Sequence, residues 1–154
     1  MAKQKTILFL CTGDYFRSRF AEVLFVSVAR KMGLPWNASS KGLALERGVS
    51  NIGSMSSSAI KTLEAMGIRD AERCRRRPAQ VTMDDLEQAD AIIALKHAEH
   101  LPLLQVRFPA FIERVEFLHV DDAPGALTLI ESKIMDLVAR LLGGGSEAPR
   151  CQRQ

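Results

Sequence analysis

Four short segments of the chain have the apolar patterns of β-strands. Residues 6–10 and 91–95 are continuous apolar runs, which is typical of strands buried on both faces of a parallel sheet. Residues 114–120 read as another strand, and residues 36–40 as a short, weakly marked one. We therefore expect four strands, spread from the beginning to the last third of the chain.

The segments between these strands carry apolar residues at helical spacing. Phe20, Val23, Leu24 and Val28 recur three or four positions apart and predict a helix at residues 17–32 that ends at Gly33. Further helices are predicted over the segment from Met55 to Met66 and at residues 84–88, 97–106 and 127–142. Strands and helices alternate, which favours a parallel sheet covered on both faces, with right-handed crossovers.

Length and composition agree with a single globular domain. The 154 residues, 47% hydrophobic and 25% charged, are enough to bury a full core. We expect one domain at residues 1–145 and a flexible polar tail at residues 146–154, after a run of three glycines. The sequence shows no secretion signal and no apolar stretch long enough for membrane insertion, so a cytoplasmic location is the expectation.

The turn after the first strand has the composition of a phosphate-binding loop. Residues 11–18, CTGDYFRS, place a thiol directly after the strand and an arginine at the start of the following helix. Free amides at the helix N-terminus and in the turn would bind an anion and stabilise a thiolate at Cys11. Arg17 could then bind two phosphoryl oxygens through its planar guanidinium. The predicted phosphate-binding residues are Thr12, Gly13, Asp14, Tyr15, Phe16, Arg17 and Ser18.

A structural cysteine at the end of a buried strand is the alternative interpretation of Cys11. The chain contains many arginines, so a cysteine and an arginine six positions apart are by themselves a weak signal. The strand before the loop, Gly13 within it, Ser18 after it and the helix beyond are independent requirements, and all are met. The combination favours the phosphate-binding interpretation.

The same residues resemble the signature of low-molecular-weight protein tyrosine phosphatases. The likeness is carried by residues 7–13, ILFLCTG, followed by Arg17-Ser18 and Ala21-Glu22, and it extends over nearly the whole chain. Residues 39–42 lie where that family has a Ser-Ala-Gly stretch, with Lys41 in place of the alanine. Residues 89–95 resemble the family's third strand. The predicted fold is a three-layer sandwich whose central four-stranded parallel sheet has the order 2-1-3-4.

The resemblance also implies where the general acid lies. Residues 120–124, VDDAP, occupy the place of the family's Asp-Pro loop, although this chain contains no Asp-Pro dipeptide. An alignment without gaps puts Asp122 on the catalytic aspartate and Ala123 on the proline. Asp121 is the alternative general acid. Because both aspartates follow the fourth strand and Cys11 follows the first, we expect them at the same edge of the sheet.

The predicted reaction has two steps. The Cys11 thiolate attacks phosphorus while Arg17 and the loop amides hold the phosphoryl oxygens, giving a thiophosphate intermediate. Asp122 protonates the leaving oxygen and then activates the water that hydrolyses the intermediate. By resemblance, Ser18 would donate a hydrogen bond to the sulfur. The reaction needs no metal and no cofactor.

Several residues depart from the family pattern. Asp14 replaces an asparagine that braces the loop, and a carboxylate there adds negative charge, so we expect weaker phosphate affinity or a less acidic thiol. Phe16 replaces a second cysteine, which removes a partner for a protective disulfide. Arg19 stands in place of a proline. The aromatic pair after the acid loop is absent, so the wall for a phosphotyrosine ring would come from Tyr15, Phe16 or elsewhere.

Charge and cysteine content limit the other function classes. The net charge of +3 is too small to indicate a nucleic-acid protein, and the basic cluster at residues 73–77 is interpreted as a solvated loop face. Cysteines at positions 11, 74 and 151 fit neither a disulfide framework nor a zinc site. The expected partner is a phosphorylated protein or a small phosphomonoester, with no nucleic acid and no membrane. No oligomeric state is predicted.

Two rival functions stay open at this point. Thioredoxin-coupled arsenate reductases share the fold and the loop, but they need two more cysteines in the segment after the third strand, and residues 97–109 contain none. A non-catalytic phosphate-binding or regulatory domain is the second rival. Among phosphatases, phosphoarginine hydrolysis is a further option, but Tyr15 stands where the family's arginine phosphatases have a threonine.

Overall fold

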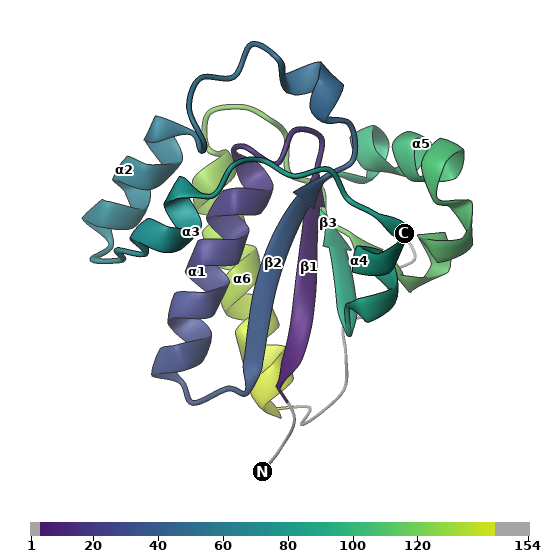
Figure 1. Cartoon of the computed structure of the whole chain (residues 1–154). Coiled ribbons are helices and arrows are strands. Elements are labelled where there is room, and N and C mark those ends of the chain that lie inside the picture. The colour runs from purple at the N-terminus through teal and green to yellow at the C-terminus, as the bar shows by residue number, and fades with distance from the viewer. Residues whose placement is uncertain (1–3, 144–154) are drawn as a thin grey trace.

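A four-stranded parallel sheet in the order β2-β1-β3-β4 runs through the centre of the molecule (Figure 1). This computed structural model describes residues 4–143. The strands are β1 (Lys5–Cys11), β2 (Trp36–Gly42), β3 (Ala91–Ala94) and β4 (Val115–Phe117). The predicted α/β class and strand order are confirmed.

The helices lie close to their predicted positions. They are α1 (Arg17–Lys31), α2 (Ser57–Ala65), α3 (Ala71–Arg75), α4 (Met83–Gln88), α5 (His97–Arg107) and α6 (Ala126–Gly143). Two short 3₁₀ helices, η1 (Leu45–Gly48) and η2 (Pro109–Arg114), complete the chain. The helix α3 and both 3₁₀ helices were not predicted, because these short segments show no helical period of apolar residues.

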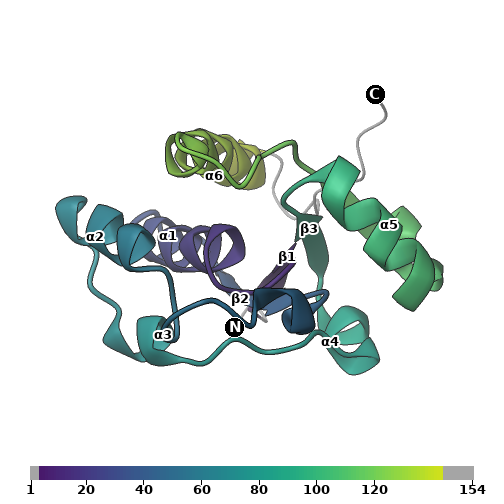
Figure 2. The same ribbon diagram turned by 90° about the horizontal axis from the view of Figure 1, so that it is seen from above.

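The two faces of the sheet bury separate apolar clusters. Ile7 and Phe9 of β1 pack into one cluster with α1, α2 and α6, whereas Leu8 and Leu10 pack into the other with α4, α5 and η2. This alternation follows from the period of two residues in a strand. Seen from above, α1 and α6 lie on one side of the sheet and α4 and α5 on the other, so the predicted three layers are present (Figure 2).

The fourth strand is shorter than predicted. Regular pairing with β3 ends at Phe117, although residues 114–120 were expected to be extended. Beyond Phe117 the chain crosses the end of β3: His119 forms an antiparallel bridge with Lys96, and the Val120 amide donates to the Leu95 carbonyl. This turn carries the two aspartates that follow toward the end of β1.

The carboxyl ends of β1 and β2 are joined tightly. The amides of Leu43 and Ala44 donate to the carbonyls of Cys11 and Thr12, at 2.9 Å in both cases. A Cβ atom at Gly42 would lie 2.8 Å from the Thr12 carbonyl oxygen, so only glycine fits at that position. The backbone after β1 is therefore fixed by β2 as well as by its own strand.

The predicted polar tail, residues 146–154, lies outside the described residues, and the assignment of residues 1–145 to one domain stays a prediction. Among the helices that the structure describes, none combines the length and the apolar character needed to cross a membrane.

Candidate functional site

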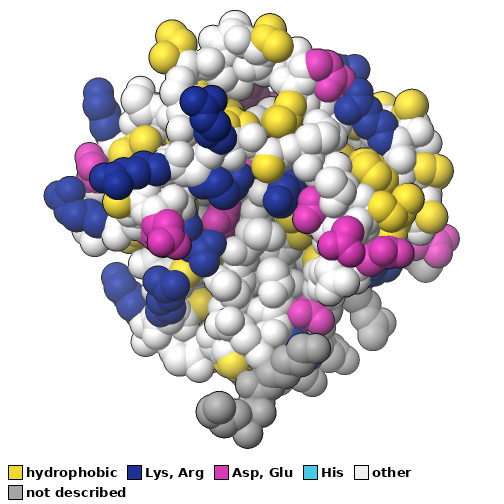
Figure 3. Space-filling model, viewed as in Figure 1, with side chains coloured by type: hydrophobic (Ala, Val, Ile, Leu, Met, Phe, Trp, Pro, Cys, Tyr) yellow, Lys and Arg dark blue, Asp and Glu magenta, His cyan; other side chains and the backbone are white. Residues whose placement is uncertain are grey.

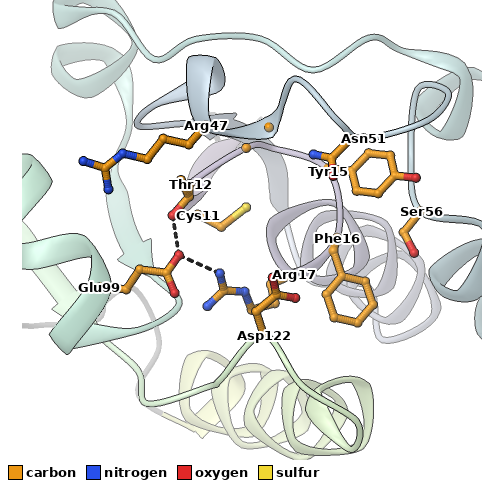
Figure 4. A pocket seen from close by; sticks show the side chains of 12 residues that line it. Cys11, Thr12, Tyr15, Phe16, Arg17, Arg47, Asn51, Ser56, Glu99 and Asp122 are labelled. Carbon is orange, nitrogen blue, oxygen red and sulfur yellow. Dashed lines mark hydrogen bonds and ion pairs between the residues drawn. The ribbon is translucent and has the colours of Figure 1, made fainter.

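The turn between β1 and α1 forms one side of a cavity of about 400 Å³ (Figure 4). The loop of residues 12–16 supplies the floor, and residues from η1, α5 and the segment after β4 supply the rim. The cavity is lined by Cys11, Thr12, Gly13, Tyr15, Phe16, Arg17, Arg47, Gly48, Asn51, Ser56, Glu99 and Asp122. Parallel sheets commonly bind ligands at this edge, beyond the carboxyl ends of their strands.

Cys11 lies at the bottom of this cavity, with its sulfur directed into it (Figure 4). The side chain is 3% exposed, and Sγ is 2.9 Å from the Ser18 hydroxyl oxygen. Helix α1 begins beside it without a side-chain cap at Phe16, so its first-turn amides are not taken by such a cap. A helix N-terminus of this kind attracts an anion.

Arg17 is buried and held by two acceptors. Its Nη1 donates to the Val120 carbonyl at 2.9 Å, and its Nη2 donates to Glu99 Oε2 at 2.8 Å. The guanidinium is thus fixed between the segment after β4 and the first turn of α5, while the residue still lines the cavity. Its remaining N–H groups can donate to a bound oxyanion.

Glu99 was not predicted as a site residue. Its Oε2 accepts hydrogen bonds from Arg17 and from the Thr12 hydroxyl, and His100 Nε2 lies 3.2 Å away. The hydrogen bond with His100 is the largest influence that lowers the pKa of Glu99 well below its usual range; burial opposes it, and Arg17 and Thr12 reinforce it. Glu99 is therefore ionised at neutral pH, which rules it out as a proton donor.

His100 is fully buried beneath Glu99. Its Nδ1 accepts from the Lys96 amide at 3.0 Å, so in the neutral ring the proton is on Nε2, facing Glu99 and Thr12. Burial lowers the pKa of His100, against the opposing effect of Glu99. A neutral imidazole thus supports the carboxylate that holds Arg17.

The two predicted acid candidates differ in their surroundings. Asp122 lines the cavity, on the side that Arg17 and Phe16 form (Figure 4). Asp121 instead forms an ion pair with Lys96, and it does not line the cavity. Only Asp122 is therefore placed together with Cys11.

Tyr15 and Phe16 form an aromatic wall on the opposite side of the cavity from Glu99 (Figure 4). The Tyr15 hydroxyl donates to the Ile52 carbonyl at 2.6 Å, and the Tyr15 carbonyl accepts from the Ser56 amide at 3.0 Å. These bonds tie the segment between η1 and α2 to the loop of residues 12–16. Arg47 lies at the rim of the cavity within η1, just before this segment, and its side chain makes no hydrogen bond or ion pair with the described residues.

Asp14 does not face the cavity as the sequence suggested. Its side chain is fully buried behind the loop and forms an ion pair with Arg76, Nη1 to Oδ2 at 3.0 Å. The interpretation of residues 73–77 as a solvated loop face was wrong for Arg73 and Arg76. Lysine and arginine side chains do gather on the face that carries α2 and α3, interspersed with carboxylates (Figure 3), but these two also bind buried acidic residues.

Comparisons with known proteins place the chain among the phosphatases. Residues 6–123 match the family model of the low molecular weight phosphotyrosine protein phosphatases. A protein-arginine-phosphatase of Bacillus subtilis is 29% identical over 109 residues, which span 71% of this chain and 67% of the relative.

Solved structures share the fold at low sequence identity. YfkJ from Bacillus subtilis is 24% identical with a TM-score of 0.77, and the match covers 94% of this chain and 99% of YfkJ. Vibrio vulnificus Wzb, solved with benzylphosphonate, is 18% identical with a TM-score of 0.75, covering 90% of this chain and 99% of Wzb. Since the family model spans most of the sequence, the chain belongs to the low molecular weight phosphotyrosine protein phosphatases, a family of cysteine-dependent phosphatases.

Proposed function

We propose that this phosphatase hydrolyses phosphotyrosine in proteins through a thiophosphate formed on Cys11. The observation that carries the proposal is the cavity itself: Cys11 Sγ lies at its floor, and Arg17 and Asp122 line the same space from different parts of the chain. The aromatic wall of Tyr15 and Phe16 suits a planar ring. A cavity of about 400 Å³ has room for a phosphorylated side chain.

In the first step the Cys11 thiolate attacks phosphorus, and the bond from phosphorus to the leaving oxygen breaks. Arg17 and the loop amides bind the equatorial oxygens. Asp122 gives its proton to the leaving oxygen, so that the tyrosine leaves as a neutral phenol. Because Glu99 is ionised, Asp122 is the carboxyl group of this cavity that we assign as the acid.

In the second step water attacks the phosphorus of the thiophosphate, and the sulfur leaves as a thiolate. Asp122, now a carboxylate, takes the proton of the water, which restores the starting state and releases inorganic phosphate. The 2.9 Å contact between Ser18 Oγ and Cys11 Sγ lets the hydroxyl stabilise the departing sulfur. Ser18→Ala is therefore expected to slow hydrolysis of the intermediate more than its formation.

Hydrolysis of p-nitrophenyl phosphate tests the assignment of the nucleophile. We expect Cys11→Ser to abolish turnover and Cys74→Ser, a matched control on α3, to keep it. Phosphate binding without turnover in the wild type would instead indicate the non-catalytic domain. Full activity of Cys11→Ser would refute the proposed mechanism.

Phosphoarginine is a second candidate substrate, favoured by one observation. Two carboxylates line the cavity, Glu99 across from the aromatic wall and Asp122 beside Phe16, and carboxylates and aromatic faces are what a guanidinium group binds. The Bacillus subtilis relative also carries the name protein-arginine-phosphatase. Parallel assays of one peptide carrying phosphotyrosine or phosphoarginine separate the two candidates, and Tyr15 leads us to expect the higher kcat/KM with phosphotyrosine.

A further inference from the structure

Asp14 occupies a strained and buried position directly behind the phosphate loop. It is fully buried, and its φ of +50° lies in the left-handed region, which aspartate tolerates better than most residues. Its Oδ1 accepts from the hydroxyls of Ser18, at 3.1 Å, and Ser40, at 2.7 Å. Its Oδ2 accepts from Arg76 Nη1 and from the Ala79 amide, both at 3.0 Å. One carboxylate thus connects α1, β2 and the segment after α3.

Arg76 neutralises this carboxylate and a second one. Besides Asp14, it binds Glu22 Oε1 through Nη2 at 3.2 Å, and the same nitrogen donates to Ser40 Oγ at 2.7 Å. Arg73 completes the pairing by binding Glu22 Oε2 at 2.6 Å. Two arginines therefore balance two buried acids beneath the loop. Burial alone would lower the pKa of Arg76, but Asp14 and Glu22 outweigh it and raise the pKa above its usual value.

Arg19 holds the backbone of residues 73–76 in place through hydrogen bonds to its carbonyls. Its guanidinium is fully buried and donates to the Arg73 and Arg76 carbonyls, both at 2.7 Å, and to the Asp14 carbonyl at 3.3 Å. The end of α3 and the backbone of the phosphate loop thus share one buried donor. The position of Arg76 relative to Asp14 is fixed by this residue, which the sequence marked only as a departure from a proline.

The ion pair between Asp14 and Arg76 matters because a carboxylate can only accept hydrogen bonds. Asp14 therefore depends on the donors around it to stay in place behind the loop. Ser18 has a single proton, which it donates either to Asp14 Oδ1 or to Cys11 Sγ. When Ser18 turns toward the sulfur, Asp14 keeps the Ala79 amide and Arg76 as donors. The single proton of Ser40 is shared between Asp14 and Glu22. Without Arg76 the buried Asp14 carboxylate would lose its ion pair, which is strongly unfavourable. Arg19 would remain nearby, but it donates to the Asp14 backbone carbonyl and not to the carboxylate.

We propose that Arg76 is a positioning residue of the phosphate loop and that Asp14 and Arg76 are an interdependent pair. Asp14 holds the loop in its anion-binding form only while Arg76 neutralises it. The inference rests on the proposed function, because it concerns the loop that binds the phosphoryl group. It predicts that the loss of Arg76 is repaired by removing the charge of Asp14, through a substitution at a position 62 residues away.

A double-mutant cycle tests this dependence. Arg76→Met removes the guanidinium and keeps much of the apolar stem, whereas Asp14→Asn removes the charge and keeps the shape. Arg77→Met is the matched control, since Arg77 is exposed and its side chain makes no hydrogen bond with the described residues. For each protein we would measure kcat and KM with p-nitrophenyl phosphate, the dissociation constant of inorganic phosphate, and Tm.

We expect Arg76→Met to lower kcat/KM by about 100-fold and to weaken phosphate binding, because the loop amides lose their alignment. Asp14→Asn alone is expected to cost only a few-fold, since Arg76 keeps Glu22 and Ser40 as partners. The double variant should recover about tenfold over Arg76→Met. Arg77→Met should match the wild type. Independent, multiplying losses in the double variant would overturn the proposal, as would wild-type phosphate binding in Arg76→Met.

If Arg76→Met does not fold, the double variant Arg76→Met/Asp14→Asn still tests the proposal. Folding of the double variant with measurable phosphate binding would then support the pair, and failure of both would contradict it. The proposed function has a separate readout, because its failure appears as absence of Cys11-dependent turnover in the wild type. The pair is still tested in that case, by phosphate binding and Tm across the cycle.

Discussion

Arg17 and Glu99 form an ion pair, with 2.8 Å between Nη2 and Oε2, at the wall of the cavity that contains Cys11. The pair has two opposed effects on a phosphoryl ligand. It fixes the guanidinium in one orientation before the ligand arrives, which favours catalysis by preorganisation. It also places a negative charge near a dianion, which disfavours binding.

The balance between these effects predicts the behaviour of Glu99 variants. We expect Glu99→Ala to lower kcat by about tenfold because, among the residues that the structure describes, Arg17 then keeps only the Val120 carbonyl as an acceptor. Inorganic phosphate should inhibit this variant at equal or lower concentration than the wild type, since the repulsion is removed. Steady-state kinetics with p-nitrophenyl phosphate and phosphate as inhibitor measure both quantities. Glu113→Ala, an exposed acid on η2, is the control, and an unchanged kcat in Glu99→Ala would contradict the role in orientation.

Substitutions of the two aspartates after β4 are expected to have different effects on activity, and the effect of Asp122→Ala should depend on the leaving group. Asp122→Ala should lose about 100-fold in kcat with phosphotyrosine peptides, whose phenol needs a proton, and much less with p-nitrophenyl phosphate. Asp121→Ala breaks only an exposed ion pair with Lys96, so its activity should stay within about twofold of the wild type. Rate profiles over a series of substituted phenyl phosphates give the comparison. The reverse pattern, with Asp121 essential and Asp122 dispensable, would reassign the acid.

Local sequence patterns predicted most of the fold and the floor of the site. The apolar runs and helical spacings place β1 and α1 within one residue of their observed ends, so the loop from Cys11 to Ser18 and its place at the sheet edge followed directly. The position of Asp122 also followed, because strands of a parallel sheet end at one edge. Such features can be predicted because they depend on the local apolar pattern or on the parallel order of the strands.

The residues that the sequence did not predict depend on contacts between distant segments. Glu99 reaches Arg17 from the first turn of α5, across 82 positions of sequence, and an acid there is also an ordinary helix-start residue. Arg73 and Arg76 lie in a run of arginines typical of a solvated surface, and nothing in the run distinguishes the two that bind buried acids. A buried ion pair forms through tertiary packing, so it produces no periodic pattern in the sequence around either residue.

The hydroxyl of Tyr15 is expected to act on the loop beyond η1. Tyr15→Phe removes the 2.6 Å bond to the Ile52 carbonyl and loosens the segment between η1 and α2, which carries Asn51 at the rim of the cavity. The bond from the Ser56 amide to the Tyr15 carbonyl remains. We expect KM for phosphopeptides to rise several-fold with little change in kcat, because the catalytic floor is unaffected. The kcat and KM for p-nitrophenyl phosphate are the control. They should be unchanged, because this substrate is too small to contact the rim. Equal effects on both substrates would indicate a change in the floor instead.

The pH dependence of stability should reveal the buried His100. Its pKa is lowered, chiefly by burial, and Arg17 and Lys96 add to the effect while Glu99 opposes it. Below about pH 6.5 the unfolded chain therefore binds a proton that the folded chain does not, so the free energy of unfolding falls as pH falls.

Urea unfolding between about pH 5 and pH 7 measures this dependence. Glu99 adds little above about pH 5.5, because its pKa is lowered in the folded state and an unfolded glutamate is almost fully ionised there as well. The slope assigned to His100 is at most about 1.4 kcal/mol per pH unit. His100→Gln should flatten the profile, while His97→Gln, which removes an exposed histidine of the same helix, should leave its slope nearly unchanged. An identical slope in wild type and His100→Gln would show that His100 gains its proton equally in the folded and unfolded states.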